Sequence, residues 1–503
     1  MRIKNNEFKI IILILMLFII FLYILSYFNV DASITLEGIE NFPESYRGYL
    51  YALKEKHPNW SFSAFYTNLD WNYVIESENQ FGKNLVPKNY EDSWKNTHPE
   101  EYNIEVDAGW VDSSRQAVEY CMDPRNFLNE VRIFQFEELS YNSRTNSLDG
   151  IEKILAGTEF YKTRVTYLDT NGNEIKMKEK YSDLILKASQ ESYVSSYHLA
   201  SRIKQEVGPF LNHNSISGQV EGYKGLYNFY NIGATSSEDK IEVIKNGLQY
   251  AKDGKGASIE LKNRYLIPWN TKEKAITGGA IFIGDSYINK GQNSIYLQKF
   301  DVSNDGNYGL FWHQYMTNIL APYSESKSIY NGYLNSGLIN TKISFVIPVF
   351  ENMPPVSQES PNINQNDFIE DNRNVICNAV NVNIRSGPKT SYEVITTVSN
   401  PEVIKRIKKG IQTNGRWDKV KLKNGIVGYI YQNYVTEILY GDANGDKKIN
   451  SIDLLVLQRH ILGIEKIDKI YQIACNIKKD GKDPSSVDLL LIQRHILGIE
   501  IIK

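Results

Sequence analysis

The distribution of hydrophobic and polar positions changes along the chain, beginning with an unbroken apolar run over residues 10–25. Basic residues precede this run, and Val30 and Ala32 then stand at positions −3 and −1 of a cut before residue 33. This order is typical of a secretory signal peptide, although about 20 apolar residues also span a bilayer. The pattern therefore predicts a signal peptide or signal anchor over residues 1–32, with the remainder of the chain outside the cytoplasm.

The longest part of the chain, residues 33–350, mixes helical apolar spacing with polar loops, which predicts a helix-rich α+β region. We divide it into an accessory N-terminal lobe, residues 33–110, and a larger domain, residues 111–350. Residues 351–373 contain three Pro and many Asn, Gln and Ser residues, but few large apolar ones. That composition predicts a linker.

Residues 374–438 change to short β-rich runs that are separated by turn signals such as Asn414-Gly415 and Asn424-Gly425. This spacing predicts a small all-β barrel. The last segment, residues 439–503, holds an internal repeat, because the apolar pattern that begins at Asp453 recurs 35 residues later at Asp488. Each copy has helical apolar spacing and stops at a Gly.

A loop rich in oxygen ligands precedes the first repeat helix. Calcium binds six to eight oxygen atoms, and an EF-hand-like loop supplies them from alternate residues, with a backbone carbonyl at position 7. Positions 1, 3, 5, 7, 9 and 12 of such a loop are filled by Asp442, Asn444, Asp446, Lys448, Asn450 and Asp453. The spacing predicts a calcium site, and the alternative is a polar turn that caps a helix.

The loop departs from the EF-hand rule in having Asp rather than Glu at position 12, and Lys447 rather than Gly at position 6. In the second copy, counted back from Asp488, position 1 is Ile477 and position 3 is Lys479. A one-residue insertion near Asp483 would instead place Asp480 at position 5. In either register, these residues predict weaker calcium binding in the second loop, or none.

The duplicated loop and helix resemble a dockerin, the module that binds cohesin domains of bacterial scaffold proteins. Nearly a whole first dockerin repeat is present as GDANGDKKINSIDLLVLQRHILG. The resemblance implies an all-α duplicated calcium-binding module, with two copies able to bind cohesin in either orientation. The residues that it implies for cohesin contact are Ser451, Ile452, Gln458, Arg459, Ser486, Val487, Gln493 and Arg494.

The predicted barrel resembles the bacterial SH3-like cell-wall domain in residues 381–388, 417–422 and 425–430. Members of that family grip peptidoglycan or its peptide stems. Ten basic and four acidic residues give the segment a net charge of +6, which favours anionic wall polymers by long-range attraction. The alternative is a basic spacer with no binding role.

The sharpest candidate for catalysis is Glu206. A helix is predicted from an N-cap at Ser195 or Ser196 to the stop at Gly208-Pro209. Glu206 lies in its last turn, where the negative end of the helix dipole disfavours a carboxylate by ~0.3–1 kcal/mol. A carboxylic acid that keeps its proton is what a general acid needs to protonate a glycosidic oxygen. Taken alone, a Glu at a helix end is more often a surface residue.

A strip that alternates Gly, Tyr and Asn follows at residues 222–234, and suits contact with sugars. Glu206 and this strip together resemble the glucosaminidase family that cleaves bacterial peptidoglycan, and residues 227–232 match the family motif position by position. The segments 123–128, 268–280, 286–293 and 312–316 resemble its clostridial-type branch.

The resemblance implies a lysozyme-like helical fold and an endo-β-N-acetylglucosaminidase that hydrolyses the β-1,4 bond after N-acetylglucosamine, with Glu206 as general acid and no catalytic cofactor. Glycosidases usually employ a second carboxylate, for which Glu221 is the candidate. The alternative nucleophile is the substrate's own N-acetyl group, oriented by a Tyr such as Tyr227 or Tyr287. The expected substrate-binding residues are Tyr227, Asn228, Tyr230, Asn231, Trp269, Tyr287 and Trp312, with core packing as the alternative for Trp269, Tyr287 and Trp312.

Composition narrows the function further. Three Cys that lie far apart exclude a disulfide-stapled scaffold and a Cys-rich zinc site, and a net charge of −3 argues against a whole-chain nucleic-acid binder. We therefore expect a secreted, cell-wall or scaffold-associated autolysin-like hydrolase, which contacts a membrane only if its leader is uncleaved. Two alternatives remain: a non-catalytic wall-binding adaptor, and an endoglycosidase that acts on N-glycans.

Overall fold

The structure is a computed structural model that describes residues 33–235, 237, 239–303, 309–411, 413 and 415–502. The predicted signal segment, residues 1–32, lies outside the described residues. Across the described part of the chain, no helix has the length and apolar character needed to cross a membrane.

The chain divides into two compact units. The first comprises residues up to 43 together with 56–124 and 131–357, and the second comprises residues 44–55, 125–130 and 358–503. The C-terminal unit therefore recruits two short segments from the N-terminal part of the chain, which the sequence pattern did not indicate.

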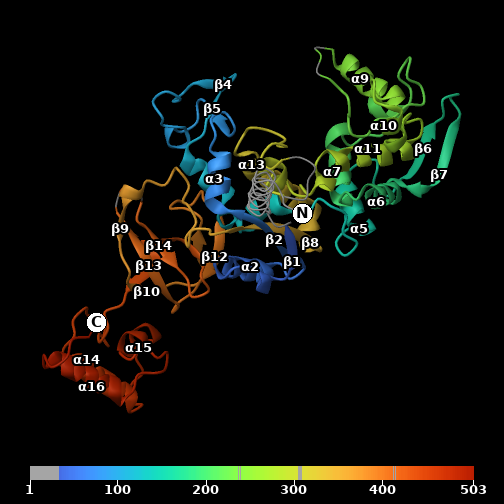
Figure 1. Ribbon diagram of the computed structural model, residues 1–503. Helices are drawn as coiled ribbons and strands as arrows, with labels where there is room; N and C mark the ends of the chain where they lie inside the picture. The colour runs from blue at the N-terminus through green and yellow to red at the C-terminus, as the bar shows by residue number, and fades with distance from the viewer. Residues whose placement is uncertain are drawn as a thin grey trace, which may run out of the picture. The chain divides into compact units, whose positions relative to one another are not determined.

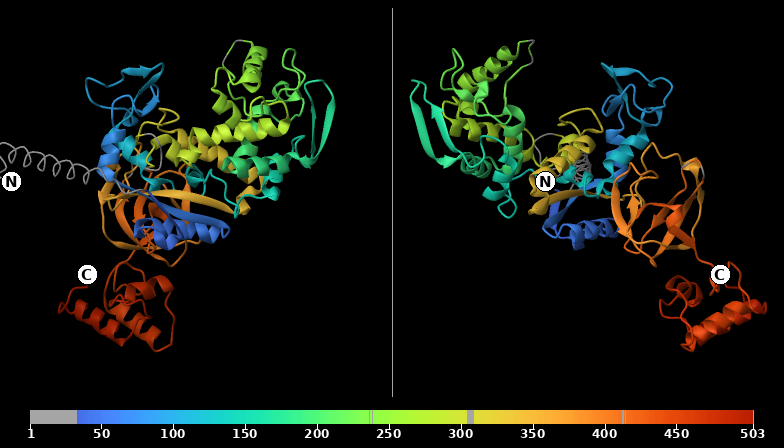
Figure 2. Two further views of the ribbon diagram at one scale, coloured as in Figure 1. Left: turned by 45° about the vertical axis from the view of Figure 1, so that its right-hand side comes forward. Right: turned by 180° about the vertical axis from the view of Figure 1, so that it is seen from behind.

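The first unit contains a three-stranded sheet with β2 (Trp60–Asp70) at its centre (Figure 1). β1 (Ile34–Glu37) pairs with it in antiparallel fashion. β8 (Ile343–Glu351) pairs with β2 on its other side, in parallel, and the two strands can be followed in Figure 2. Residues that we predicted as a separate accessory lobe thus share one sheet with the end of the larger predicted domain.

The core of this sheet is aromatic. Trp60 is completely buried, and its indole N–H donates to the carbonyl of Ile339 at 3.0 Å. Phe134 packs edge-on against Trp60 at a centroid distance of 5.6 Å. Most residues of β8 are buried, as expected for a parallel strand that is covered on both faces.

Helices make up most of the remaining first unit. α6 packs against α11, and α7 packs against α5 and α6. The helices are α3 (Trp71–Glu78), α4 (Arg115–Met122), α5 (Leu148–Leu155), α6 (Tyr181–Ser192), α7 (Ser196–Val207), α8 (Asn214–Ser217), α9 (Lys240–Asp253), α10 (Ile259–Arg264), α11 (Lys272–Ser286), α12 (Ile295–Phe300) and α13 (Ala321–Ser336). The small sheets are β3 (Leu85–Pro87), β5 (Trp110–Asp112) and β4 (Glu105–Asp107), and the hairpin β6 (Arg164–Leu168) with β7 (Glu174–Lys180).

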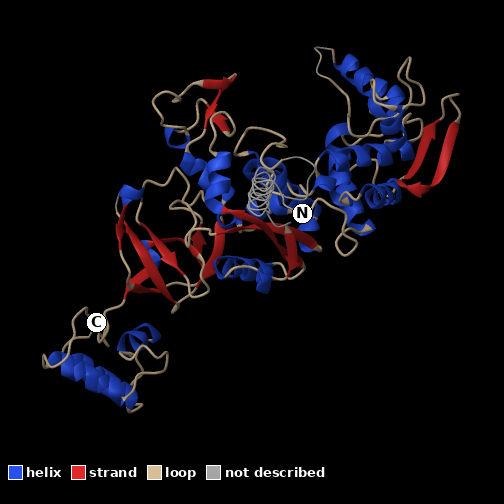
Figure 3. Ribbon diagram, viewed as in Figure 1, coloured by secondary structure: helices blue, strands red, loops and turns tan. Residues whose placement is uncertain are grey.

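The second unit begins with a strongly strand-rich segment (Figure 3). Its strands follow the order β12-β11-β15-β14-β13-β10-β16, and β9 pairs with β13. Their bounds are β9 (Phe368–Glu370), β10 (Asn374–Cys377), β11 (Val382–Arg385), β12 (Val394–Val398), β13 (Val403–Gly410), β14 (Trp417–Lys421), β15 (Val427–Tyr431) and β16 (Val435–Glu437).

Part of the predicted linker belongs to this unit. β9 extends the sheet, and Ile363 is buried with Trp417 and Tyr429. Glu359 forms an ion pair with Lys419 and accepts a hydrogen bond from the Tyr429 hydroxyl. Residues 358–373 therefore pack against the barrel, because their few apolar residues are placed where the strands leave a hydrophobic surface.

A buried arginine ties the strands together. Arg406 on β13 is 2 % exposed and lies 2.8 Å from Asp371, 3.2 Å from Asp418 and 2.7 Å from Glu437. Hydrogen bonds from Lys409 and Arg406 lower the pKa of Glu437 to about 2. A buried cation that is fully paired fixes the register of its neighbours, here β14, β16 and the segment before β10.

α2 (Glu44–Lys56) also contributes to the second unit. The Tyr49 hydroxyl accepts the N–H of Val427 at 3.0 Å and donates to its carbonyl at 3.2 Å. A Cβ added at Gly48 would lie 2.1 Å from the carbonyl oxygen of Asn424. The absence of a side chain at Gly48 thus allows the helix to approach the turn before β15.

Within the described residues 439–502, three helices are the only regular elements: α14 (Ser451–Ile461), α15 (Lys469–Cys475) and α16 (Ser486–Ile496). Leu457 of α14 and Ile492 of α16 are both completely buried and share one core with Cys475. The two repeat helices therefore pack against each other through equivalent apolar positions.

Candidate functional site

The α7 helix places Glu206. The Ser195 side chain accepts the N–H of His198 at 3.5 Å, which makes Ser195 the N-cap. The helix stops at Gly208, whose φ of 71° is accessible to Gly at little cost. Ile203 and Val207 face the core, while the Glu206 side chain keeps 27 % of its surface exposed. The predicted helix and its end are confirmed.

Two side chains hold the Glu206 carboxylate. The Asn231 amide donates to Glu206 Oε2 at 3.1 Å and to the Glu206 backbone carbonyl at 3.0 Å. Arg202, one turn earlier on α7, places Nη2 3.6 Å from Glu206 Oε1. Asn231 of the strip and Glu206 at the end of the helix are 25 positions apart in sequence but in direct contact in the structure.

A second carboxyl group, that of Glu325 on α13, is influenced by the charge of the same arginine. Burial raises the pKa of Glu325, whereas the hydrogen bond from the Tyr315 hydroxyl at 2.8 Å and the charge of Arg202 act in the opposite direction. Arg202 pairs with Glu206, whereas only its charge acts on Glu325, because no ion pair joins Arg202 and Glu325 within the described residues. Sequence reasoning missed Glu325, because nothing in its local pattern distinguishes it from a surface Glu of an amphipathic helix.

Glu221, the carboxylate predicted from the sequence, lies elsewhere. It is exposed on the loop after α8, and makes no hydrogen bond or ion pair with another described residue. The charge of Arg202, which pairs with Glu206, acts on Glu325, and no such link is found for Glu221 among the described residues.

The first residues of the strip are structural. Tyr227 and Asn228 are completely buried. The Tyr227 hydroxyl accepts the N–H of Leu168 at 2.8 Å and donates to its carbonyl at 2.6 Å. The Asn228 amide donates to the carbonyls of Ile232 and Gly247, both at 2.9 Å. The hydrogen-bonding atoms of both side chains are already paired with backbone groups, so these residues support the conformation of the strip rather than contact a ligand.

Trp269 has the same role, because it is completely buried and its indole N–H donates to the Tyr265 carbonyl at 2.7 Å. Tyr230 differs. It is 3 % exposed, but its hydroxyl has no hydrogen-bond partner among the described residues, and neither does Nε of Arg202. Such unpaired buried polar atoms are uncommon and often mark functional sites. Both lie in the residues that surround Glu206.

Two of the predicted sugar-stacking residues are accessible. Trp312 exposes 85 % of its surface, and its backbone N–H is fixed by Asp301 Oδ2 at 3.1 Å. Tyr287 is half-buried and stacks on His313 with a centroid distance of 4.4 Å. These two aromatic residues, together with Asn231, remain available for contact with a ligand.

Residues from the predicted accessory lobe support the segment that carries Trp312. Gln314 donates to Glu78 Oε1 at 2.8 Å and accepts from Lys299 Nζ at 3.2 Å. Lys299 also donates to Asn84 at 2.7 Å. Glu78 and Lys299 are completely buried, and burial lowers the pKa of Lys299 to about 8. The lobe therefore contributes a buried polar network beneath the candidate site.

A cavity of about 340 Å³ lies between α7 and α13. Glu137 lines this cavity and is 6 % exposed, and its Oε1 atom accepts a hydrogen bond from the Tyr333 hydroxyl at 2.5 Å. Burial raises the pKa of Glu137 to about 7. Glu206 is not among the lining residues, so this cavity does not belong to the Glu206 cluster.

A groove of about 460 Å³ lies on the barrel of the second unit. Its walls include Trp417, Tyr431 and Tyr434, whose neighbouring ring centroids are 5.6 and 6.1 Å apart, and Arg385. Aromatic faces beside a cationic group suit a wet polar ligand. Sequence reasoning placed Trp417 in a family motif but did not identify this groove.

The first repeat loop, residues 442–453 (loop 1), is closed by its own carboxylates. Asp442 is 5 % exposed and accepts the N–H groups of Gly445 at 2.7 Å and of Lys447 at 3.0 Å. Lys447, where an EF-hand has Gly, adopts a φ of 65°. The loop therefore makes the sharp turn of position 6 in spite of the lysine.

Asp453 at position 12 is completely buried. It accepts the N–H groups of Ala443 and Asn450, both at 2.8 Å. Within the described residues, no cationic side chain forms an ion pair with Asp442 or Asp453, and no group of three or more His, Cys, Asp or Glu side chains is arranged to hold a metal ion. Two buried carboxylates thus face only backbone donors.

The residues predicted for cohesin contact are exposed. Ile452 is 53 % exposed and its counterpart Val487 is 49 % exposed. Arg459 pairs with Glu465 at 3.1 Å, and Arg494 pairs with Glu500 at 3.1 Å. The other members of this set, all exposed, are Ser451, Gln458, Ser486 and Gln493. The two repeats therefore present equivalent surfaces.

Comparisons with known proteins agree with the three resemblances. Residues 440–497 match the family model of the dockerin type I domain, and residues 380–436 match that of the bacterial SH3 domain. A β-N-acetylglucosaminidase of Bacillus subtilis (strain 168) is 29 % identical over 234 residues, which are 45 % of this chain and 22 % of that protein. A bifunctional autolysin of Staphylococcus aureus (strain MSSA476) is 25 % identical over 219 residues, 42 % of this chain and 15 % of that protein.

The chain thus spans less than a quarter of the length of these relatives. Among solved structures, a major bifunctional autolysin aligns with 58 % of this chain and 98 % of its own, at 23 % identity and a TM-score of 0.37. Staphylococcus aureus glucosaminidase B aligns with 58 % and 94 %, at 23 % identity and a TM-score of 0.38. TM-scores this low carry no conclusion about the fold.

Proposed function

We propose that this protein is a secreted glycoside hydrolase that cleaves β-1,4 bonds after N-acetylglucosamine in peptidoglycan, and that its dockerin attaches it to a cohesin-bearing scaffold. The names of the similar glucosaminidase and autolysin support the substrate class. The observation that carries the proposal is the grouping of Glu206 with Asn231 and Arg202 at the end of α7.

In the proposed reaction, Glu206 donates its proton to the glycosidic oxygen as the bond to the anomeric carbon breaks. Asn231 orients the carboxyl group through one oxygen, which leaves Oε1 on the side of Arg202. A water molecule then supplies the hydroxyl group of the new reducing end, and its second proton restores the acid.

Glu325 is our candidate for the second carboxyl group, in place of Glu221. It accepts a hydrogen bond from the Tyr315 hydroxyl, and the charge of Arg202, the ion-pair partner of Glu206, also acts on it. Its role is either to activate the water or to orient Tyr315 toward the substrate. Trp312 and Tyr287 are the accessible aromatic faces on which sugar rings would stack.

The other two modules would locate the enzyme. The basic barrel, with its groove of Trp417, Tyr431 and Tyr434, would bind wall polymer or peptide. Loop 1 fits calcium by the chemistry of its donors, because carboxylates, amide oxygens and a backbone carbonyl occupy alternate positions and two buried carboxylates lack a cation. The residues that would hold the ion are Asp442, Asn444, Asp446, Lys448 (through its carbonyl), Asn450 and Asp453. We propose the domain boundaries given from the sequence with two changes: residues 358–373 belong to the barrel, and β1 and β2 of the predicted accessory lobe share one sheet with β8.

Product analysis tests the activity. Purified peptidoglycan and a glycoprotein with high-mannose N-glycans are each incubated with the protein, and the products are analysed by mass spectrometry. Fragments with N-acetylglucosamine at the reducing end, released only from peptidoglycan and only with Glu206 intact, are the expected result. Release from the glycoprotein alone would favour an N-glycan endoglycosidase. Binding to walls without any release by the wild-type protein would favour an adaptor.

A further inference from the structure

The second repeat loop, residues 477–488 (loop 2), has the same backbone framework as loop 1. In loop 1, Asp453 accepts the N–H of Ala443 at 2.8 Å. In loop 2, Asp488 accepts the N–H of Lys478 at 3.2 Å and that of Ser485 at 2.9 Å. Lys478 and Ala443 are 35 positions apart, the spacing of the repeat, so Lys478 occupies in loop 2 the place of Ala443 in loop 1.

The donors of loop 2 do not fit a calcium ion. Ile477 replaces the carboxylate of position 1, Lys479 stands at position 3, and Gly481 stands at position 5. Asp480 and Asp488 are the carboxylates that remain near the lysine. Calcium needs six to eight oxygen ligands, and the side chains of loop 2 cannot supply most of them.

The side chain of Lys478 points back into its own loop. Its Nζ atom lies 3.2 Å from Ser485 Oγ, 3.7 Å from Asp480 Oδ2 and 3.7 Å from Asp488 Oδ2. Asp488 is 1 % exposed. A buried carboxylate without a cation is costly. In loop 2 the Lys478 ammonium group faces Asp488, whereas within the described part of the chain no cationic side chain pairs with Asp453 of loop 1.

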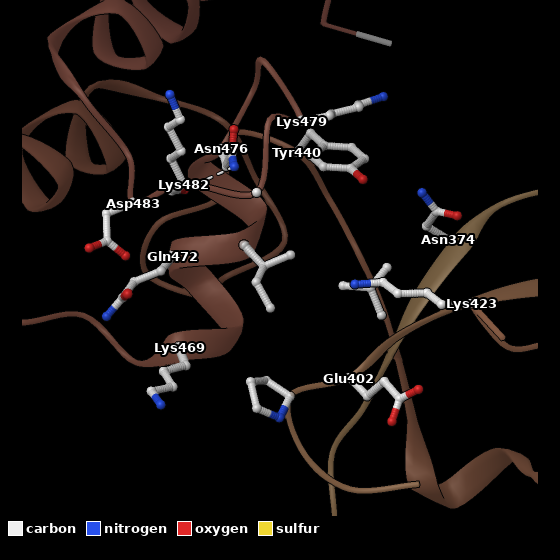
Figure 4. A pocket seen from close by; sticks show the side chains of 14 residues that line it. Asn374, Glu402, Lys423, Tyr440, Lys469, Gln472, Asn476, Lys479, Lys482 and Asp483 are labelled. Carbon is white, nitrogen blue, oxygen red and sulfur yellow. Dashed lines mark hydrogen bonds between the residues drawn. The ribbon is translucent and has the colours of Figure 1, made fainter. Parts of the chain in front are cut away.

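Further hydrogen bonds join residues of loop 2 and its flanks, although the buried Asn476 Oδ1 has no partner among the described residues. The Asn476 amide donates to the Lys482 carbonyl at 2.9 Å, the interaction drawn as a dashed line in Figure 4. Asp480 accepts the N–H of Lys482 at 3.1 Å. The ammonium group of Lys479 lies over the ring of Tyr440, 4.3 Å from its centroid. The loop is therefore tied at several points by its own residues.

We propose that the Lys478 ammonium group takes the place of the calcium ion in loop 2, so that the module binds one ion and the α16 half keeps its fold without calcium. The calcium requirement of loop 1 rests on the function proposed above, but the role of Lys478 does not. When calcium is removed, α16 would therefore stay folded and keep its exposed surface, while α14 would become less stable.

Two measurements on the full chain test this proposal. Calorimetric titration with calcium alone is expected to give one site in the wild-type protein and none in Asp453→Asn. Amide hydrogen exchange with excess calcium or excess EDTA is expected to show at least ten-fold faster exchange of α14 in EDTA, with a clearly smaller change in α16.

The matched variant is Lys478→Met, which keeps the aliphatic stem and removes the charge. It is expected to accelerate exchange of α16 by about ten-fold in calcium and in EDTA alike, and to leave one calcium site. Two sites in the wild-type protein, equal responses of α14 and α16 to EDTA, or unchanged α16 exchange in Lys478→Met would overturn the proposal. If the wild-type protein binds no calcium, the function proposed for loop 1 fails, and Lys478→Met still decides the role of the lysine.

Discussion

The carboxyl groups of the Glu206 cluster and those of loop 1 meet different partners. Glu206 and Glu325 come from two helices of the first unit, and each has a neutral hydrogen-bond donor. Arg202 pairs with Glu206, and its charge also acts on Glu325. Asp442 and Asp453 come from one short loop and accept only backbone N–H groups there. In the first arrangement, side chains of the protein position the carboxyl groups. In the second, the negative charge of the two carboxylates is unbalanced, and a bound cation would neutralise it.

The difference has a consequence for what each site requires. A carboxyl group that must exchange a proton needs a fixed orientation and moderate exposure, which Asn231 and the 27 % exposed Glu206 side chain provide. A carboxylate that coordinates a metal needs freedom from competing cations. Loop 2, in which Lys478 faces Asp488 at 3.7 Å, shows the same framework with that freedom removed.

The largest effect is expected from Glu206→Gln. The amide keeps the shape and the hydrogen bond with Asn231 but cannot donate the proton, so hydrolysis should fall by about 100- to 10,000-fold. The measurement is the rate of reducing-end release from purified peptidoglycan, with circular dichroism as a check on folding. Glu221→Gln is the matched control and should keep nearly full activity. Comparable losses in both variants would remove the basis for preferring the α7 cluster.

Removal of calcium should have the next largest effect, and only on the C-terminal module. An ion at 100 times its dissociation constant adds ~2.7 kcal/mol to the unfolding free energy. Chelation, or Asp453→Asn in the presence of calcium, should therefore lower the melting transition of this module by several degrees. Differential scanning calorimetry separates it from the transition of the first unit, which should not move. A shift of both transitions would contradict a local role for the ion.

Glu325→Gln should reduce hydrolysis less than Glu206→Gln. Loss of one charged hydrogen-bond acceptor costs ~1.5–3 kcal/mol, which corresponds to about a 10- to 150-fold lower rate. If Glu325 activates the water, the acidic limb of the pH–rate profile should change as well. If it only orients Tyr315, then Tyr315→Phe should reproduce the loss and the double variant should add little. Full activity of Glu325→Gln would leave Glu206 without a second carboxyl partner.

The smallest effect concerns Glu137, a buried carboxyl group that accepts a hydrogen bond from the Tyr333 hydroxyl and forms no ion pair with another described residue. Burial raises its pKa from 4.5 to about 7 in the folded protein. Between these values the folded state binds more protons than the unfolded state, so the unfolding free energy should fall as pH rises from 4.5 to 7. Thermal unfolding across this range should show the slope, and Glu137→Gln should reduce it. An unchanged slope in that variant would assign the pH dependence to other groups.

The elements of the barrel and of the repeat were predicted well from local pattern. Turn signals, period-two alternation and a 35-residue repeat each act over a few neighbouring residues, and the matches to the SH3 and dockerin family models agree with them. Helix α7 was also predicted with its N-cap and its stop, because both signals lie within the helix or beside it.

The features that the sequence did not reveal all depend on contacts between residues that are far apart along the chain. Tyr227, Asn228 and Trp269 have the residue types of a sugar site, but tertiary packing encloses them and gives their polar atoms to the backbone. Glu325 has no distinguishing local pattern, and only the tertiary structure shows that Tyr315 donates to it and that the charge of Arg202 acts on it. The sequence pattern made the accessory lobe look like a separate domain. Its link to the larger domain is the parallel pairing of β2 with β8, which joins residues more than 270 positions apart and leaves no local signal.

The sequence by itself determined the strand-rich and repeat segments, the spacing of the proposed calcium ligands and the position of Glu206 at the end of a helix, because these depend on periodicity and on neighbours along the chain. Only the tertiary structure decided which residues lie around Glu206, which tyrosines are enclosed, that the N-terminal lobe shares a sheet with β8, and that the Lys478 ammonium group turns into its own loop. Each of these depends on which side chains burial brings within a few ångströms, and that distance is set by the packing of elements rather than by their order.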